Sequence, residues 1–401
     1  MISVDQALEF MLARARPLAE SESVPLTEAL GRVLARAESS PIDVPGYANS
    51  SMDGYAVRAA DAGGEAPVSL RVSQRIAAGE VGVPLAPGEA ARIFTGAPLP
   101  TGADAVVIQE DCESAGEQVR FRVSVAVGEN VRPRGNDIVA GSEVLAAGTR
   151  LRPQELGLAA SVGLARLEVV RRLRVAIFSS GDELVQPGEP LPPGAIYNSN
   201  RYTLRGLLSA LGCSVIDLGS VEDNLAATRA ALEDAAAGAD VVVASGGMSV
   251  GDEDHVKRAV EQCGRLEMWR VAVKPGKPLA YGRIAGADFI GLPGNPVSTL
   301  LTFCLFVRPF LLRRQGVPRV HASALAVPAA FSWPRPGGRR EYLRARLEQG
   351  AAGVAASIYP KQGSDVLTSA VWADGVVEIR EGRTVEPGDL VPYYSFAELL
   401  Y

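Results

Sequence analysis

The 401-residue sequence has few of the residues from which proteins build soft metal sites. Its four cysteines are scattered without a CxxC pair, and it has only two histidines. Because structural zinc sites need closely grouped thiolates or imidazoles, these counts disfavour a zinc site. Any bound metal is therefore expected on carboxylates and ligand oxygens, which suit Mg²⁺ or another hard cation.

The sequence also lacks a long uninterrupted apolar run and a secretory leader. The longest apolar run, Val297 to Leu312, is broken by Arg308-Pro309. It is too short to cross a bilayer, so we expect a buried helix. Asp5 and Glu9 lie inside what would be the apolar part of a signal peptide. These features predict a cytoplasmic protein with no membrane span.

Lysine is the scarce cation of this chain, with four residues against 36 arginines, and the net charge of -6 disfavours non-specific nucleic-acid binding. Lys274 and Lys277 lie three residues apart in KPGKP, where Pro275 and Gly276 favour a turn that brings both ammonium groups to one side. An ammonium group is a compact point charge suited to phosphate or an oxyanion. The alternative is a solvated hairpin tip, and these residues alone favour neither.

The pattern of apolar residues, glycines and prolines divides the chain into four kinds of segment. Residues 173–319 alternate apolar strands with helical stretches, which predicts a doubly wound parallel sheet. Residues 41–138 and 320–401 show short strands separated by glycine-rich and proline-rich turns, typical of all-β modules, the second read as a small β-barrel. Helical stretches in 1–40 and 139–172 suggest one split, elongated helical domain with the first β module inserted. We therefore predict a multidomain α/β plus β protein.

Glycines and acids are concentrated in the turns that follow the predicted parallel strands: SSGDEL, GSVEDN, SGGMSVGDEDH and LPGNPVS. Ligands of such sheets bind beyond the carboxyl ends of the strands, where backbone N–H groups and helix N-termini point outward. A phosphate cradle is expected from Ser245, Gly246, Gly247 and Ser249. Carboxylates beside such a cradle suit a bridging divalent cation, and the candidate metal or general-base groups are Glu183, Asp223 and Asp254.

Structural alternatives exist for these acids. Asp182 or Glu183 would instead cap the helix that follows its strand. Asp252, Glu253 and Asp254 would instead be first-turn acids that favour the helix dipole. Single glycine turns after strands are common and are weak evidence by themselves.

Taken in order, the motifs resemble the molybdopterin molybdenumtransferase family, which is also represented by the E domain of gephyrin. The resemblance covers nearly the whole chain. Its motifs are NSSMDGYAVR, RIFTGAPLPTGADAVV, NVRPRGNDI, SSGDEL, SGGMSVGDEDHV, KPGKP and GLPGNPVS.

The resemblance implies a homodimer in which adenylylated molybdopterin and molybdate yield molybdenum cofactor, AMP and water, assisted by Mg²⁺. It implies catalytic roles in the inserted β module for Asp53, Thr95 and Asp137, and in the α/β domain for Glu183, Asp223 and Asp254. It implies cofactor contacts at Ser180, Gly181, Ser245, Gly246, Gly247, Ser249, Lys274, Lys277, Pro293, Gly294, Arg339, Arg340 and Ser364, of which Arg339 and Arg340 are alternatives for one position.

Two departures from the family pattern affect the expected metal ligands. Asn224 follows Asp223 where the family commonly has a second Asp, and Asn136 precedes Asp137 where it commonly has Glu. The alternative functions are a tungstate-inserting paralogue, a molybdopterin adenylyltransferase and a non-catalytic scaffold. Plausible partners are a molybdopterin adenylyltransferase and molybdoenzyme acceptors. In an elongated dimer the two sets of acids could meet across the interface.

Overall fold

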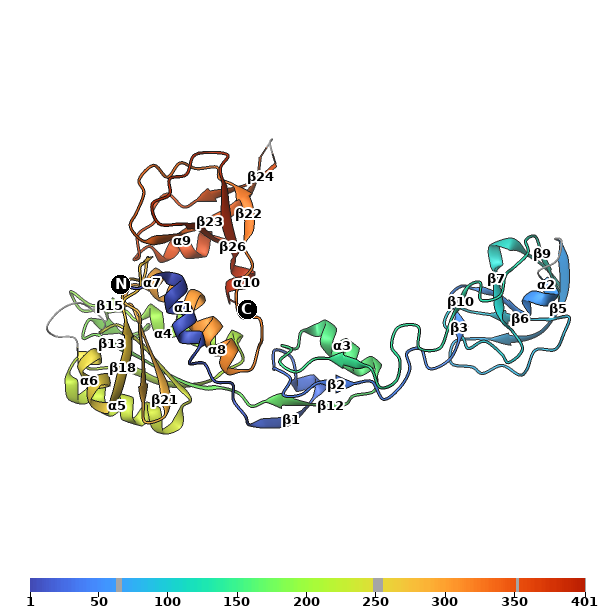
Figure 1. The fold of residues 1–401 in the computed structure, drawn as a ribbon, viewed down its shortest axis with the longest axis horizontal. Helices are drawn as coiled ribbons and strands as arrows, with labels where there is room; N and C mark the ends of the chain where they lie inside the picture. Colours follow the sequence, from blue (N-terminus) through green and yellow to red (C-terminus); the bar gives the residue numbers. More distant parts are fainter. Residues whose placement is uncertain (63–66, 248–254, 351–352, 401) are drawn as a thin grey trace.

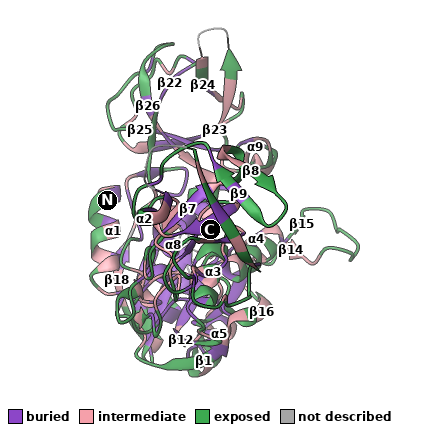
Figure 2. Ribbon diagram, turned by 90° about the vertical axis from the view of Figure 1, so that its right-hand side faces the viewer, coloured by how far each residue is buried: buried purple, intermediate pink, exposed green. Residues whose placement is uncertain are grey.

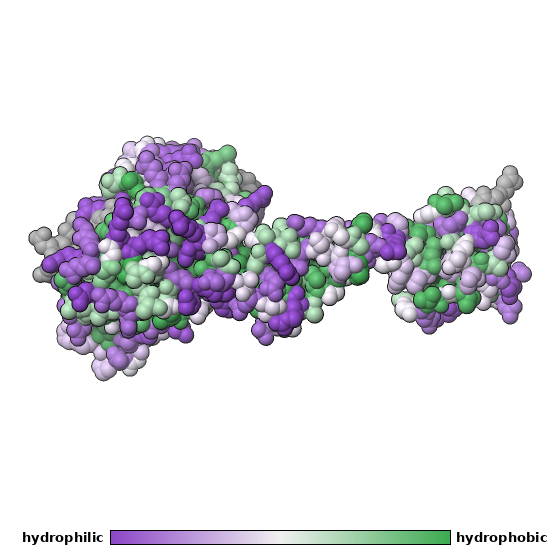
Figure 3. Space-filling view, turned by 60° about the horizontal axis from the view of Figure 1, so that its bottom comes forward, coloured by the Kyte–Doolittle hydropathy of each residue, from purple (hydrophilic) through white to green (hydrophobic). Residues whose placement is uncertain are grey.

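The molecule is elongated, with a main body, a narrow neck and a distal domain. The structure is a computed structural model that describes residues 1–62, 67–247, 255–350 and 353–400. Both termini lie on the main body (Figure 1). The neck between the body and the distal domain is thin in the space-filling view (Figure 3).

The main body is built on a six-stranded sheet in the order β16-β13-β17-β21-β20-β18. The first four strands are parallel, β20 runs antiparallel to β21, and β18 runs antiparallel to β20. The predicted α/β domain and the fold class are therefore confirmed. The strands are β13 (Arg174–Ser180), β16 (Ser214–Val221), β17 (Val241–Ser245), β18 (Gly264–Trp269), β20 (Ala280–Ile284) and β21 (Ala287–Leu292).

Alternate residues of the central strands enter two separate cores, which explains why these strands are apolar on both faces. Ile177 and Val243 belong to one core, whereas Phe178 and Val242 belong to the other. Helices cover the faces of the sheet: α4 (Ser199–Ala210), α5 (Leu225–Gly238), α6 (His255–Cys263), α7 (Pro296–Thr302) and α8 (Arg308–Arg314).

The apolar segment from Val297 to Leu312, which was predicted to be a buried helix, does form a buried helix. It comprises α7, a π-helical turn η3 (Phe303–Val307) and α8. By length and composition this 19-residue helix could cross a membrane, but 78% of its most apolar window is buried inside the protein. It is therefore a core helix. In Figure 2, where the distal domain overlaps the main body, buried residues lie toward the centre and exposed residues toward the periphery.

The first helix, α1 (Val4–Leu12), lies on the main body and not in the split domain to which residues 1–40 were assigned. Its buried residues Val4, Ala7 and Met11 form one helical stripe that joins the core containing Phe310 of α8. The split domain itself contains one α-helix, α3 (Pro153–Ser161), and two strand pairs. These pair β1 (Ser21–Pro25) with β12 (Arg166–Val170), and β2 (Glu38–Ser39) with β11 (Glu143–Leu145).

The distal domain forms a six-stranded sheet in the order β7-β4-β6-β5-β9-β8, with two small cores of its own. A two-stranded pair, β3 (Asn49–Ser50) with β10 (Val131–Arg132), lies at its junction with the neck. The sheet strands are β4 (Gly54–Val57), β5 (Val68–Ile76), β6 (Glu89–Ile93), β7 (Ala105–Ile108), β8 (Cys112–Ala115) and β9 (Gln118–Phe121).

The C-terminal domain is a β sheet in the order β19-β23-β25-β26-β22, with β24 paired to β23. Strand β19 (Val273–Lys274) comes from the α/β segment, so this sheet joins the two domains. The remaining elements are β22 (Leu325–Pro328), β23 (Arg340–Gly350), β24 (Gly353–Ile358), α9 (Leu367–Trp372), β25 (Gly375–Ile379), β26 (Leu390–Ser395) and α10 (Phe396–Leu400).

Candidate active site

A cavity of about 1050 Å³ lies at the carboxyl ends of the parallel strands. The turns after β13, β17 and β21 form one side of it, and the KPGKP turn and the C-terminal domain form the other. The cavity is lined by thirteen of the predicted site residues: Ser180, Gly181, Glu183, Asp223, Ser245, Gly246, Gly247, Lys274, Lys277, Pro293, Gly294, Arg339 and Ser364.

The order of strands explains this location. The chain passes from β13 through α4 to β16 on one side, and then through α5 to β17 on the other side of β13. A crevice opens where the connections diverge, which is where sheets of this type bind ligands. Ser179 and Ser245 are opposite each other in the register of β13 and β17, with their Oγ atoms 3.1 Å apart. The cavity begins at these strand ends.

Glycine is required where the backbone turns tightly around this crevice. Gly246 has φ +85°, and a Cβ there would come within 2.2 Å of the Ser180 carbonyl oxygen. Gly247 has φ +62°, and its Cβ would meet Val256 Cγ2 at 2.5 Å. Both positions favour glycine conformationally as well as sterically. Gly246 and Gly247 of the predicted cradle therefore form a close backbone turn on the cavity wall.

Three carboxylates line the cavity: Glu183 and Asp223 from the α/β domain, and Asp365 from the C-terminal domain. The Ser180 hydroxyl donates to Asp223 Oδ1 at 3.1 Å, and the Asp223 backbone N–H donates to Asp182 Oδ1 at 3.1 Å. The Glu183 carboxylate lies over Gly181, because a Cβ on Gly181 would come within 2.5 Å of Glu183 Oε2. Asp223 is thus fixed by hydrogen bonds with Ser180 and Asp182, whereas the Glu183 carboxylate packs against Gly181.

The capping alternative for Asp182 and Glu183 is wrong. Helix α4 begins at Ser199, and its N-cap is Asn198, whose side chain accepts a hydrogen bond from the Arg201 N–H at 3.2 Å. Asn198 also contacts the strand end, because Ser179 Oγ donates to its Oδ1 at 3.3 Å.

The KPGKP turn places both lysines on the cavity wall, as predicted. Gly276 has φ +112°, and a Cβ there would meet Thr302 Cγ2 at 2.3 Å, so this turn packs closely on α7. Lys274 pairs with Glu341 at 3.0 Å. Among the residues that the structure describes, Lys277 has no ion pair. Lys274 is therefore not at a hairpin tip, because it lies in β19 and pairs with β23.

The C-terminal domain contributes Arg339 and Ser364 to the cavity. Arg339 donates to the Val273 carbonyl oxygen at 3.2 Å, and Ser364 accepts from Asn295 Nδ2 at 3.0 Å. Arg340 was the alternative to Arg339, and it lies elsewhere. It forms a two-pronged ion pair with Asp5 at 2.7 and 2.8 Å, and those hydrogen bonds raise its pKa. The assignment of Arg340 as a cofactor contact is therefore wrong.

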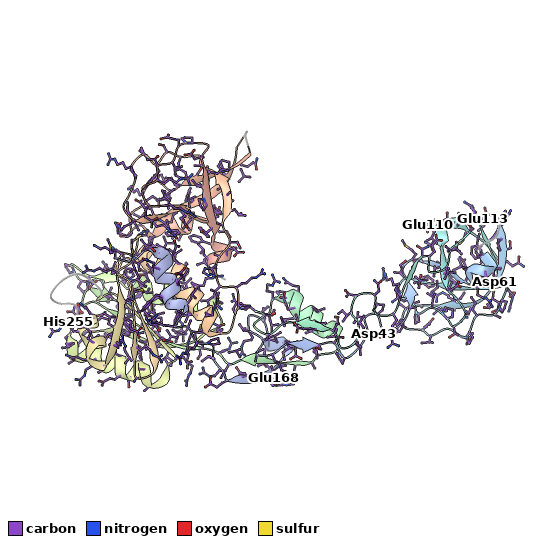
Figure 4. The ribbon with its side chains drawn as sticks, viewed as in Figure 1. Asp43, Asp61, Glu110, Glu113, Glu168 and His255 are labelled. Atoms are coloured by element: carbon purple, nitrogen blue, oxygen red, sulfur yellow. The ribbon has the colours of Figure 1, made fainter. Side chains whose placement is uncertain are left out.

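The distal-domain candidates are not near the cavity. Asp53 Oδ1 accepts from the Thr95 N–H and hydroxyl, both at 2.8 Å, and these bonds hold the Asp53 pKa below its ordinary value. Asp137 is exposed. Their domain carries Asp61 and Glu113 at one end of Figure 4, whereas His255 marks the α/β domain at the other. One chain therefore brings together only part of the predicted site.

Two predicted residues, Ser249 and Asp254, lie outside the described residues. Within the described ranges no group of three or more His, Cys, Asp or Glu side chains is arranged as a metal site. The pair of Glu183 and Asp223 still fits Mg²⁺, because proteins often bind this ion through one or two carboxylates and complete its coordination with substrate phosphates.

Sequence reasoning missed several amide side chains that order the cavity wall. Asn200 Nδ2 donates to the Gly294 carbonyl oxygen at 2.7 Å, and Asn295 Nδ2 reaches Ser364. Gln362 brackets Arg344 by accepting from its N–H at 2.9 Å and donating to its carbonyl oxygen at 3.0 Å. The available signal was position: NSN and GNP each stand just before an expected helix, where polar side chains meet the strand ends.

Models of one family's domains match almost the entire chain. The MoeA N-terminal region (domain I and II) matches residues 2–163, the probable molybdopterin binding domain matches 176–313, and the MoeA C-terminal region (domain IV) matches 326–396. A Haemophilus influenzae protein named molybdopterin molybdenumtransferase is 38% identical over 410 residues, covering 100% of both chains. The chain belongs to the molybdopterin molybdenumtransferase family.

Other members of this family are similarly close. Molybdopterin molybdenumtransferase 2 of Mycobacterium tuberculosis is 39% identical, covering 92% of this chain and 93% of its own. A solved molybdopterin biosynthesis protein MoeA of Pyrococcus horikoshii is 35% identical, with a TM-score of 0.80 and 99% of each chain covered. The family and the architecture thus agree with the strand order and the cavity.

Proposed function

We propose that this enzyme inserts molybdate into the dithiolene of adenylylated molybdopterin and releases AMP and molybdenum cofactor. The observation that carries the proposal is the composition of the cavity. A glycine turn at the sheet end, three carboxylates (Glu183, Asp223 and Asp365) and three cations line one space of about 1050 Å³. Such a space suits a ligand with a phosphate, an apolar ring system and a second anionic centre. Membership of the family supports the same activity.

The residues of this chain supply binding and charge stabilisation. The turn at Gly246 and Gly247 presents backbone to a phosphate, and Lys277 and Arg339 place positive charge where an oxyanion would bind. Mg²⁺ held by Glu183 and Asp223 would neutralise phosphate charge. Positioning would account for much of the rate, because thiolates are intrinsically good metal ligands.

We further propose that the active site is completed in a homodimer by the distal domain of a second copy. Asp53 is held by Thr95 on the distal domain, and Met52 next to it is 48% exposed. In an elongated two-fold dimer, this region of one subunit would meet the partner's cavity. The cytoplasmic location, and partnership with an adenylyltransferase and acceptor enzymes, remain predictions.

The alternatives are separated by one assay. The wild-type protein is incubated with adenylylated molybdopterin and either molybdate or tungstate, and AMP and metal-bound cofactor are measured. AMP release coupled to molybdate insertion is the expected result. Preference for tungstate would identify the tungstate-inserting alternative, and cofactor binding without AMP release would identify a scaffold. Formation of adenylylated molybdopterin from ATP would identify an adenylyltransferase.

A further inference from the structure

A buried carboxylate forms an ion pair with one of the two lysines that line the cavity. Glu341 is 5% exposed, and its Oε2 lies 3.0 Å from Lys274 Nζ. The two residues face each other across the parallel pairing of β19 with β23, which fixes their relative position. The other carboxylate oxygen packs against Gly337, where a Cβ would come within 2.4 Å of it.

The three cations of the cavity therefore differ. Lys274 forms an ion pair with Glu341, whereas Lys277 and Arg339 have no carboxylate partner among the described residues. A buried negative charge beside an anion site is unfavourable for anion binding, since unit charges a few ångströms apart interact by several kcal/mol in a medium of intermediate dielectric. The fold nevertheless keeps Glu341 in place.

We propose that Glu341 is a charge-balancing residue of this cavity. By pairing with Lys274 it orients the ammonium group and lowers the affinity of the site for dianions, so that anionic ligands are exchanged and not trapped. The dianion is either the oxyanion substrate or the phosphate of AMP, which share the same charge. The inference rests on the proposed function, because it takes the cavity to bind these anions.

Charge balance makes a specific prediction for three variants. Glu341→Gln leaves one added positive charge, Lys274→Gln leaves one added negative charge, and the double variant leaves the original net charge. Molybdate affinity should therefore be highest in Glu341→Gln, similar in the wild type and the double variant, and lowest in Lys274→Gln. A pair with only a structural role would make the double variant no better than either single one.

Ligand charge provides a second signature. The gain in binding free energy is proportional to the charge of the ligand, so molybdate should bind Glu341→Gln about tenfold tighter and perrhenate, a tetrahedral monoanion, about threefold tighter. Glu348→Gln is the control, because Glu348 lies on the same strand and pairs with Arg346 outside the cavity. Its affinity for both anions should match the wild type.

The experiment is isothermal titration of the full chain with molybdate, perrhenate and AMP in separate arms. Tightening for molybdate assigns the paired dianion to the oxyanion substrate, and tightening for AMP alone assigns it to the phosphate. No tightening in either arm would overturn the proposal, as would a double variant weaker than Lys274→Gln. If Glu341→Gln does not fold, the comparison of the double variant with Lys274→Gln decides. Failure of wild-type AMP release would instead refute the proposed function.

Discussion

The cavity and the distal domain each hold an aspartate with a hydroxyl donor, but in different surroundings. Ser180 donates to Asp223 at 3.1 Å on the wall of the cavity. Thr95 donates to Asp53 at 2.8 Å at the other end of the molecule. Predicted catalytic groups far from a cavity have no ligand to act on within their own chain. The comparison teaches that one chain separates its predicted catalytic residues into two groups, which the proposed dimer would bring together.

The largest effect is expected from filling the glycine turn of the cavity. Gly246→Ala places a Cβ 2.2 Å from backbone, whereas Gly79→Ala in the distal domain has the same φ of +85° and no atom within 4 Å. Positive φ costs each variant about 1 kcal/mol, and overpacking adds about 1–3 kcal/mol at Gly246. Thermal unfolding should show the larger loss for Gly246→Ala, with loss of activity. Equal losses would mean that the turn relaxes freely.

The next effect concerns charge on the cavity side. Lys277→Ala and Lys274→Ala should each lower kcat/KM by about 10- to 100-fold, because charge-assisted ligand contacts contribute about 1.5–3 kcal/mol. The melting temperature should change little for Lys277→Ala, since exposed charges contribute about 0–1 kcal/mol to stability, but it should fall for Lys274→Ala, which leaves the buried Glu341 without its partner. Steady-state kinetics beside thermal unfolding checks both expectations. Wild-type kinetics in both variants would remove the lysines from the binding site.

Removal of divalent cations is expected to stop AMP release, and Mg²⁺ alone should restore it. The physical reason is the pair of Glu183 and Asp223 beside the glycine turn, which suits a hard cation bridging to phosphate. Activity is measured in excess chelator and after Mg²⁺ is added back. Undiminished turnover in chelator would exclude the cation from the reaction.

The smallest effect belongs to the distal aspartate. The Thr95 bonds hold the Asp53 pKa below 3.8, so Asp53 stays ionised at every pH above that range. Its contribution to stability is present above the unfolded pKa and is lost as pH falls through the lowered folded value. Thr95→Val should move the Asp53 pKa back toward normal in an NMR titration. A pKa that does not move would show that the hydroxyl bond is unimportant.

Local pattern was enough to predict the α/β domain and most of the cavity. The alternation of strands and helical stretches in 173–319 was predicted, and the structure shows it, for example in α5 between β16 and β17. Strand ends fall at one edge of a parallel sheet, so the turns containing Gly181, Gly246 and Gly294 could be expected to meet.

Errors arose where the outcome depends on packing between distant segments. Helix α1 has an ordinary amphipathic stripe, and nothing local says that it packs on α8. Arg339 and Arg340 are adjacent, and because side chains alternate in extended backbone, one faces the cavity and the other faces Asp5.

The most direct test of the proposed dimer mixes two inactive variants. Asp53→Ala disables the distal domain, and Asp223→Ala disables the cavity. After subunit exchange by random mixing, about half of the dimers contain both variants, and each of these holds one intact site of two. Activity should therefore recover to about a quarter of the wild type. If exchange is independently confirmed and no activity returns, each site is built within one subunit and the account is wrong.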